Sequence, residues 1–320
     1  MKRLLVALIL IAVAISGCTE KGPSVADKSA EELKNLSISS AENLSSYSLK
    51  SSLTSTWKLH SGNNTTTEKL NTFTENVETV AVVDLQGLKV HANSSTKNML
   101  EAPNLPANVT TTNVDFYLIG NSTYMDDGDG NWTHLVDPRQ AEEVWGPDRN
   151  NQIKTLAGTF NLSTTEELGT ESVNGEDAYK LKIVPGNEDN ASLFNTAFAI
   201  AAKVTQYPLF LPSLNRSELN ETGKIEKTIW ISKSSYLPVK YESVMSFTMT
   251  PELIGAVDPS SGKATMFNQS VQLGAITVAI ESTDLYYDFD QPLNITPSMQ
   301  ALSSPAITPQ DITNQAGEQA

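Results

Sequence analysis

The side chains that most often bind metals or transfer protons are spread along this sequence without a recognisable site. Its three histidines lie on separate predicted strands, with no partner at a metal-ligand spacing: His60, His91 and His134. Asp127 begins a segment like a calcium-binding EF-hand loop, but Trp132 stands where that loop needs glycine and no glutamate follows at the twelfth position. Nucleophile motifs, glycine-rich phosphate loops and His-Glu-x-x-His are also missing from the sequence. We therefore predict no catalytic residue, no metal and no cofactor. A glycan hydrolase with two close carboxylates remains the enzymatic alternative.

Cys18, the one cysteine, ends a segment that has the parts of a secretory signal. Lys2 and Arg3 precede an unbroken apolar run over residues 4–15, and two small residues follow it. As a helix this run would span only about 18 Å, whereas the hydrocarbon core of a membrane is about 30 Å thick. We therefore expect residues 1–17 to be removed as a signal peptide.

The four residues Ile15-Ser16-Gly17-Cys18 resemble the lipobox of prokaryotic lipoproteins, in which the cysteine is lipidated and becomes the mature N-terminus. A plain secretory signal with an incidental cysteine is the alternative. Loss of residues 1–17 removes two basic residues and no acid, so the formal charge changes from −15 to −17. So acidic a protein repels nucleic acid and anionic headgroups, which excludes a nucleic-acid partner. Membrane attachment, at the outer face of the cytoplasmic membrane, then rests on the Cys18 lipid.

Sequons for N-glycosylation are unusually dense for a chain of this composition. Fourteen Asn-x-Ser/Thr sites occur where chance predicts roughly five, which favours glycosylation of an exported surface. An Asn-, Ser- and Thr-rich surface that makes sequons by accident is the alternative. Dense sequons with a lipobox are similar to archaeal cell-surface lipoproteins. The candidate glycosylation sites are Asn63, Asn64, Asn93, Asn121, Asn190 and Asn220.

Hydropathy patterns predict one α+β domain over residues 29–293, after a polar linker at 18–28. Ser29 and Glu32 form a capping-box pattern for a helix from about 30 to 44. Strict alternation from Tyr47 onward predicts a long strand with one apolar face. Asn174-Gly175 predicts a tight hairpin. A wide apolar stripe predicts a helix over about 189–207.

The last strands and the C-terminus carry two further predictions. Apolar residues lie on even positions up to Ile280 and on odd positions from Leu285, which predicts a bulge or bend near Ser282. Residues 294–320 are rich in Pro, Ser, Thr and Gln, and we expect a disordered tail there. Long antiparallel strands with one wet face need helices on the other face.

Two segments resemble the lipoprotein-carrier superfamily, which includes LolA, LolB and mycobacterial lipoproteins of the LppX type. Residues 173–181 resemble its "nG-x-x-x-Y-x-L" hairpin, and residues 228–233 with 236–241 resemble its "W-I-d-k … y-L-P-x-k" strand pair. The resemblance implies an open, curved antiparallel half-barrel whose concave side holds acyl chains beneath helices. Its motifs are structural, so no family binding residue transfers to a position of this chain.

The apolar faces of the predicted elements suggest a common hydrophobic pocket. Its candidate residues come from two strands and one helix: Tyr47, Leu49, Leu53, Trp57, Phe194, Phe198, Tyr241, Met245, Phe247 and Met249. A filled core without a cavity is an equally good interpretation, because burying a CH₂ group contributes about 0.8 kcal/mol against either a side chain or a lipid. The first functional hypothesis is an anchored protein that binds or transfers a lipid, lipoprotein or other hydrophobic ligand. The second is a glycosylated surface or sensor lipoprotein that binds protein partners, none of which the sequence identifies.

Overall fold

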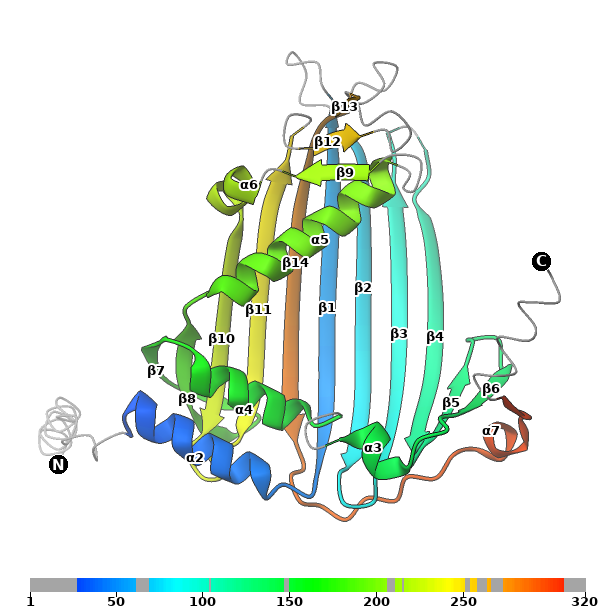
Figure 1. Cartoon of the computed structure of the whole chain (residues 1–320), viewed down its shortest axis with the longest axis vertical. Helices are drawn as coiled ribbons and strands as arrows, with labels where there is room; N and C mark the ends of the chain where they lie inside the picture. The colour runs from blue at the N-terminus through cyan, green and yellow to red at the C-terminus, as the bar shows by residue number, and fades with distance from the viewer. Residues whose placement is uncertain are drawn as a thin grey trace, which may run out of the picture.

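The computed structural model describes residues 28–61, 69–103, 105–146, 150–205, 211–214, 216–250, 254–257, 264–265 and 273–307. Within these residues the dominant element is one open, twelve-stranded sheet, seen in Figure 1 as a row of long strands. From one edge to the other its strands are β15 (Ala306–Ile307), β6 (Trp132–Val136), β5 (Ser122–Asp126), β4 (Asn108–Ile119), β3 (Lys89–Glu101), β2 (Lys69–Asp84), β1 (Ser46–Ser61), β14 (Leu273–Tyr287), β11 (Pro238–Met249), β10 (Lys224–Ser232), β8 (Glu176–Ile183) and β7 (Thr165–Val173). Neighbouring strands are antiparallel except for β15 and β6, which are parallel.

Helices cover one face of this sheet, which we call the helix-covered face. In Figure 1, α2 and α4 lie across its lower part, and α5 crosses its upper part diagonally. The described helices on this face are α2 (Ala30–Glu42), α3 (Ala141–Trp145), α4 (Gln152–Leu162), α5 (Asn187–Thr205) and α6 (Arg216–Thr222). A short further helix, α7 (Met299–Ser303), packs on the opposite face against β5 and β6. A small second sheet contains β9 (Leu211–Leu214), β12 (Ile254–Val257) and β13 (Ala264–Thr265). The predicted α+β class, a mostly antiparallel sheet covered by helices, is confirmed.

The alternation of β1 determines which side chains meet the helices. Tyr47 and Leu49 are buried beneath α2 and α4, whereas Ser52, Thr54 and Lys58 are exposed on the other face. Every second side chain of a strand points to the same face. The register of β1 with β14 and β2 therefore determines which side chains of those two strands also point toward the helices.

Two separate apolar clusters lie under the helices. The lower cluster joins α2 and α4 to the sheet, and its buried members include Leu33, Tyr47, Phe160, Ile153, Leu181 and Ile229. The upper cluster joins α5 and α6 to the sheet, and its buried members are Leu193, Ala197, Ile200, Ala201, Leu219, Phe247, Met249, Ile276 and Val278. The division into two clusters leaves the middle of the helix-covered face available for a cleft.

Local sequence signals account for the ends of several elements. The Ser29 hydroxyl accepts the Glu32 N–H, and the Glu32 carboxylate accepts the Ser29 N–H at 3.0 Å, so the predicted capping box is confirmed. The predicted Asn174-Gly175 turn joins β7 to β8, with positive φ at both residues. The acidic loop after Asp126 is a hairpin turn between β5 and β6.

The predicted bulge near Ser282 is wrong. β14 pairs with β1 and β11 in continuous register through Ser282, so its even-numbered residues face the helices from Ile276 to Tyr286. Leu285, at an odd position, packs instead against a small apolar cluster on the opposite face, around Trp230 and Val239. The apolar residues of β14 therefore change from even to odd positions because Leu285 belongs to an apolar cluster on the opposite face, and the strand does not bend.

The prediction of a disordered tail is wrong for residues 294–307. Ile295 is 4% exposed and packs with Tyr117 and Tyr124 on the face away from the helices. The Ser298 hydroxyl caps α7 by accepting the Ala301 N–H at 3.1 Å. Low hydrophobicity misled the prediction because a few well-placed apolar side chains are enough to hold this segment against the sheet. Residues 308–320 lie outside the described residues.

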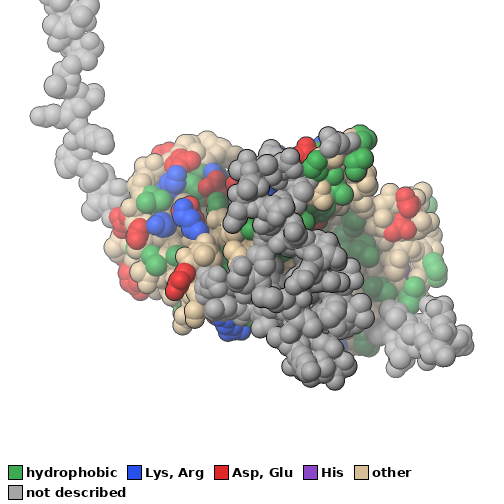
Figure 2. Space-filling view, turned by 90° about the horizontal axis from the view of Figure 1, so that it is seen from above, with side chains coloured by type: hydrophobic (Ala, Val, Ile, Leu, Met, Phe, Trp, Pro, Cys, Tyr) green, Lys and Arg blue, Asp and Glu red, His purple; other side chains and the backbone are tan. Residues whose placement is uncertain are grey.

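Charged side chains of both signs lie on the outer surface, with hydrophobic patches between them (Figure 2). None of the helices in the described part of the chain combines the length and apolar character needed to cross a membrane. The predicted signal peptide, Cys18 and most of the linker lie outside the described residues.

Candidate functional site

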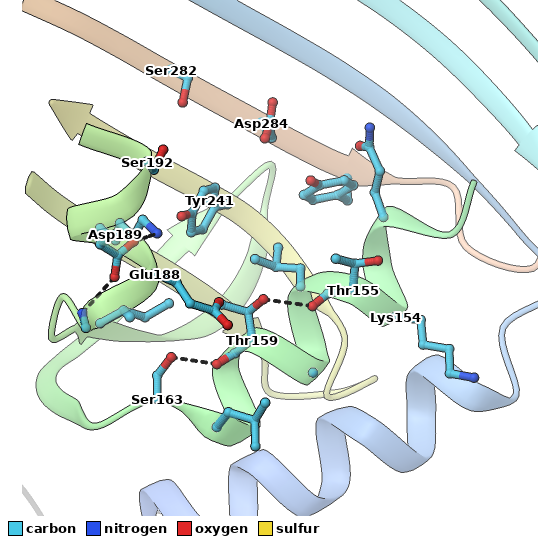
Figure 3. Close-up of a pocket in the computed structure, with 18 of the residues that line it drawn as sticks. Lys154, Thr155, Thr159, Ser163, Glu188, Asp189, Ser192, Tyr241, Ser282 and Asp284 are labelled. Carbon is cyan, nitrogen blue, oxygen red and sulfur yellow. Dashed lines mark hydrogen bonds and ion pairs between the residues drawn. The ribbon is translucent and has the colours of Figure 1, made fainter. Parts of the chain in front are cut away.

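A cleft of about 1460 Å³ opens on the helix-covered face, between the two apolar clusters. Its floor comes from β1, β2, β10, β11 and β14, while α4 and the start of α5 form its sides. Figure 3 shows Thr155 and Thr159 on α4, Asp189 and Ser192 on α5, and Asp284 on β14, all around this space. The cleft exceeds the roughly 300–1,000 Å³ that small-molecule sites usually enclose.

Apolar side chains line part of the cleft. Leu49 and Leu53 contribute from the floor, and Leu156 contributes from α4. Ile38 of α2 also lines the cleft, as does Leu162 at the end of α4, which is 88% exposed. Exposure of a leucine beside a cleft leaves apolar surface available to a ligand.

Polar side chains form a row across the middle of the floor. Tyr241 on β11 is in register with Asp284 on β14, Asp284 with Ser51 on β1, and Ser51 with Thr79 on β2. All four line the cleft, and we call them the polar row. The Thr79 hydroxyl is 3.0 Å from the Ser94 hydroxyl on β3, which continues the row.

An ion pair between α5 and β10 lines the cleft. Asp189, 9% exposed in the first turn of α5, accepts hydrogen bonds from the Lys227 ammonium on β10 and, at 2.8 Å, from the Gly186 N–H. Burial alone would lower the pKa of Lys227, but the hydrogen bond and charge of Asp189, together with a hydrogen bond to Tyr241, outweigh burial and raise this pKa. Lys227 is therefore charged at neutral pH and neutralised by Asp189.

Burial dominates the electrostatics of the polar row. It raises the pKa of Asp284, and hydrogen bonds with Ser51 and Tyr286 only partly oppose this effect. Burial also raises the pKa of Tyr241 and of Tyr286, so both phenols are neutral. Protonation of Asp284 therefore costs less free energy than protonation of a carboxylate in water.

The ten predicted pocket residues divide between the cleft and the filled core. Leu49, Leu53 and Tyr241 line the cleft. The others belong to packed clusters or to the surface: Tyr47 lies in the lower cluster, Trp57, Phe194, Met245, Phe247 and Met249 lie in or against the upper cluster, and Phe198 is 37% exposed. Tyr47 is fixed further because its hydroxyl accepts the Gln152 N–H at 3.2 Å, and burial raises its pKa to about 12.

Of the polar members of the site, sequence reasoning found Tyr241 and missed the others. Ser51 was visible only as an interruption of the apolar face of β1, and Asp284 belonged to a strand whose facing was misassigned. Asp189 and Lys227 carry no local motif that pairs them. Their signal lies in the strand register and helix placement, which one sequence does not contain.

The candidate sequons occupy different environments. Asn93, Asn190 and Asn220 are exposed, while Asn63 and Asn64 lie outside the described residues. Asn121 is half-buried, and its amide nitrogen donates hydrogen bonds to the carbonyl oxygens of Asp137 at 2.8 Å and Arg139 at 3.2 Å.

Two of the histidines lie on the face away from the helices. His91 is stacked on Tyr117 and is 2.7 Å from an Asp115 oxygen, and His134 is stacked on Tyr124. The imidazole of His60 is 3.0 Å from the Thr277 hydroxyl. In the described part of the chain, no three His, Cys, Asp or Glu residues gather in a way that could hold a metal ion.

Comparisons with known proteins give only distant structural likenesses. No protein-family model matches the chain, and no curated protein matches it. The crystal structure of LprF from Mycobacterium bovis is 14% identical, with a TM-score of 0.35 over 84% of this chain and 96% of LprF. Lipoprotein LppX from Mycobacterium tuberculosis is 13% identical, with a TM-score of 0.34 over 83% of this chain and 98% of LppX. A putative outer membrane lipoprotein-sorting protein domain from Vibrio parahaemolyticus is 9% identical, with a TM-score of 0.19 over 82% of this chain and 93% of that domain. Identities and TM-scores this low leave the function to be argued from the cleft itself.

Proposed function

We propose that this chain is an exported lipoprotein, anchored through Cys18 at the outer face of the cytoplasmic membrane, whose cleft binds a lipid or another amphiphilic ligand. The cleft carries this proposal: its volume of about 1460 Å³ and its mixed lining suit a molecule with both hydrocarbon and polar parts. Transfer of a hydrocarbon chain from a bilayer to Leu53 and Leu156 exchanges one apolar environment for another. The small net gain suits transient binding and transfer better than storage.

The predicted anchor would keep the cleft close to the membrane. Cys18 is twelve positions before Ala30, where α2 begins, and twelve residues reach at most about 40 Å. The Lys34 ammonium on α2 donates to the Ser163 carbonyl oxygen at 2.7 Å, at the edge of the cleft beside the end of α4. The anchor therefore leads to the helix that lies beside the cleft opening.

Obstruction of the cleft tests the proposal. Gly158 on α4 lines the cleft, and a Cβ atom added there would meet nothing within 4 Å. A tryptophan at this position, Gly158→Trp, should therefore occupy ligand space without a clash, and removing a helical glycine favours the helix by up to about 1 kcal/mol. Full-length protein is isolated from its own membranes, and mass spectrometry of its organic extract measures ligand per protein. We expect at least a tenfold loss in Gly158→Trp.

The matched control is Asn161→Trp, on the same helix at an exposed position outside the cleft lining. It should keep the ligand content of the unsubstituted protein. Equal ligand content in Gly158→Trp and the unsubstituted protein would contradict the proposal. Ligand-free protein in every case would favour the alternative, a glycosylated surface or sensor lipoprotein that binds protein partners.

A further inference from the structure

The floor of the cleft is polar where a site for hydrocarbon alone would be apolar. The polar row places a phenol, a carboxyl group and two hydroxyls side by side over four neighbouring strands. Ser282 on β14 and Ser192 on α5 add further hydroxyls to the lining. Polar groups in a partly buried site lose free energy unless they find hydrogen-bond partners. Asp284 already shares hydrogen bonds with Ser51 and Tyr286, and Thr79 with Ser94, but each of these oxygens has further hydrogen-bonding capacity that a ligand covering the floor can use.

The charges around the cleft oppose an anionic partner. Among the described residues, four acidic side chains and two basic ones line it: Glu42, Glu188, Asp189 and Asp284 against Lys154 and Lys227. Lys227 already contacts Asp189, so its ammonium is not a free site for a phosphate. A phosphate group would meet a net negative lining, in surroundings where charges interact more strongly than in water.

We propose that the cleft selects uncharged amphiphiles whose hydroxyl groups hydrogen-bond to the polar row, and that it discriminates against anionic phospholipids. This inference rests on the proposed lipid-binding function and specifies its ligand class. A hydroxyl both donates and accepts, so it matches Ser51 and Thr79, which can do either, and Asp284 in its neutral or charged form. Leu53, beside the polar row, is placed to contact the first part of a hydrocarbon chain.

Photo-crosslinking in membranes tests this selectivity. Full-length protein is reconstituted in phosphatidylcholine vesicles that contain either a galactosyl diacylglycerol or a phosphatidylglycerol, each with the same diazirine-bearing chain. Adducts are then mapped by mass spectrometry to peptides that line the cleft. We expect cleft adducts from the galactolipid to exceed those from phosphatidylglycerol by about tenfold, the effect of one or two hydrogen bonds.

Substitution of Asp284 assigns the effect to the polar row. Asp284→Leu should reduce galactolipid adducts about tenfold, to the phosphatidylglycerol level, whereas Asp284→Asn, which still donates and accepts, should keep most of them. The matched control is Glu281→Leu, an acidic residue on the same strand but exposed on the opposite face. It should label like the unsubstituted protein.

The outcomes separate this inference from the function beneath it. Equal cleft labelling by both lipids, or unchanged galactolipid labelling in Asp284→Leu, would overturn the selectivity while the cleft remained a lipid site. Absence of cleft adducts from either lipid would overturn the lipid-binding function and the selectivity with it.

Discussion

Replacement of Asp189 by alanine should strongly destabilise the protein, because this carboxylate has three roles. It neutralises Lys227, accepts the Gly186 N–H at 2.8 Å and places a negative charge in the first turn of α5. Its side chain is 12% exposed and that of Lys227 is 20% exposed, so water replaces these interactions only in part. Lys227→Met is the milder change, because Asp189 keeps its bond to Gly186 and its place at the helix N-terminus.

The expected free energies follow from these roles. The lost hydrogen bond costs about 0.5–1.5 kcal/mol, the lost charge at the helix N-terminus about 0.3–1 kcal/mol, and the uncompensated Lys227 about 1–3 kcal/mol. Asp189→Ala should therefore lower the free energy of unfolding by about 2–5 kcal/mol, and Lys227→Met by about 1 kcal/mol. The double variant should be no less stable than Asp189→Ala alone, because it removes the uncompensated charge.

Urea unfolding of the full-length protein, followed by tryptophan fluorescence, measures these values by linear extrapolation. The four proteins complete a double-mutant cycle, in which we expect a coupling of about 1–2 kcal/mol between the two residues. Additive effects, or a loss below about 0.5 kcal/mol in Asp189→Ala, would refute the account of this ion pair.

Two further predictions concern glycosylation and pH. Glycopeptide mapping of protein from its native host should find glycan at exposed Asn93 and none at Asn121, because a glycan would displace its bonds to the carbonyls of Asp137 and Arg139; glycan at Asn121 alone would contradict this. The Asp284→Asn variant should have about the same free energy of unfolding as the unsubstituted protein near pH 4. As pH rises through the raised pKa of Asp284, the variant should become the more stable of the two. The direction follows because a raised pKa in the folded state means that the fold favours neutral Asp284, and this stabilisation is lost when the carboxyl group ionises. Urea unfolding between pH 4 and 8 measures the effect. A difference in free energy of unfolding that stays constant over this range would contradict the prediction.

The parts of the fold that local chemistry determines could be predicted from the sequence. Ser29 and Glu32 mark the start of α2, Asn174-Gly175 marks a hairpin, and the alternation from Tyr47 marks β1 with its buried face. In each case the signal and the structure it specifies lie within a few residues of each other.

Predictions that depended on distant partners failed. Leu285 seemed to require a bulge because its cluster, around Trp230, is built from strands far away in the sequence. Ile295 lies in a polar segment and is buried only because Tyr117 and Tyr124 provide a surface for it. Hydrophobic patterns within one segment do not contain the surface against which that segment packs.

The same limit left open whether the helix-covered face holds a filled core or a cavity. Tyr47 and Phe247 are core residues and Leu53 lines the cleft, yet all three satisfy the same alternation. What separates them is the polar row. If α4 and α5 closed over it, Asp284 and its hydroxyl neighbours would be buried against Thr155 and other polar groups, at a cost of about 1–3 kcal/mol for each group left without a partner. The polar row, which would carry this cost, becomes recognisable only when Ser51, Asp284 and Tyr241 are seen in register across three strands.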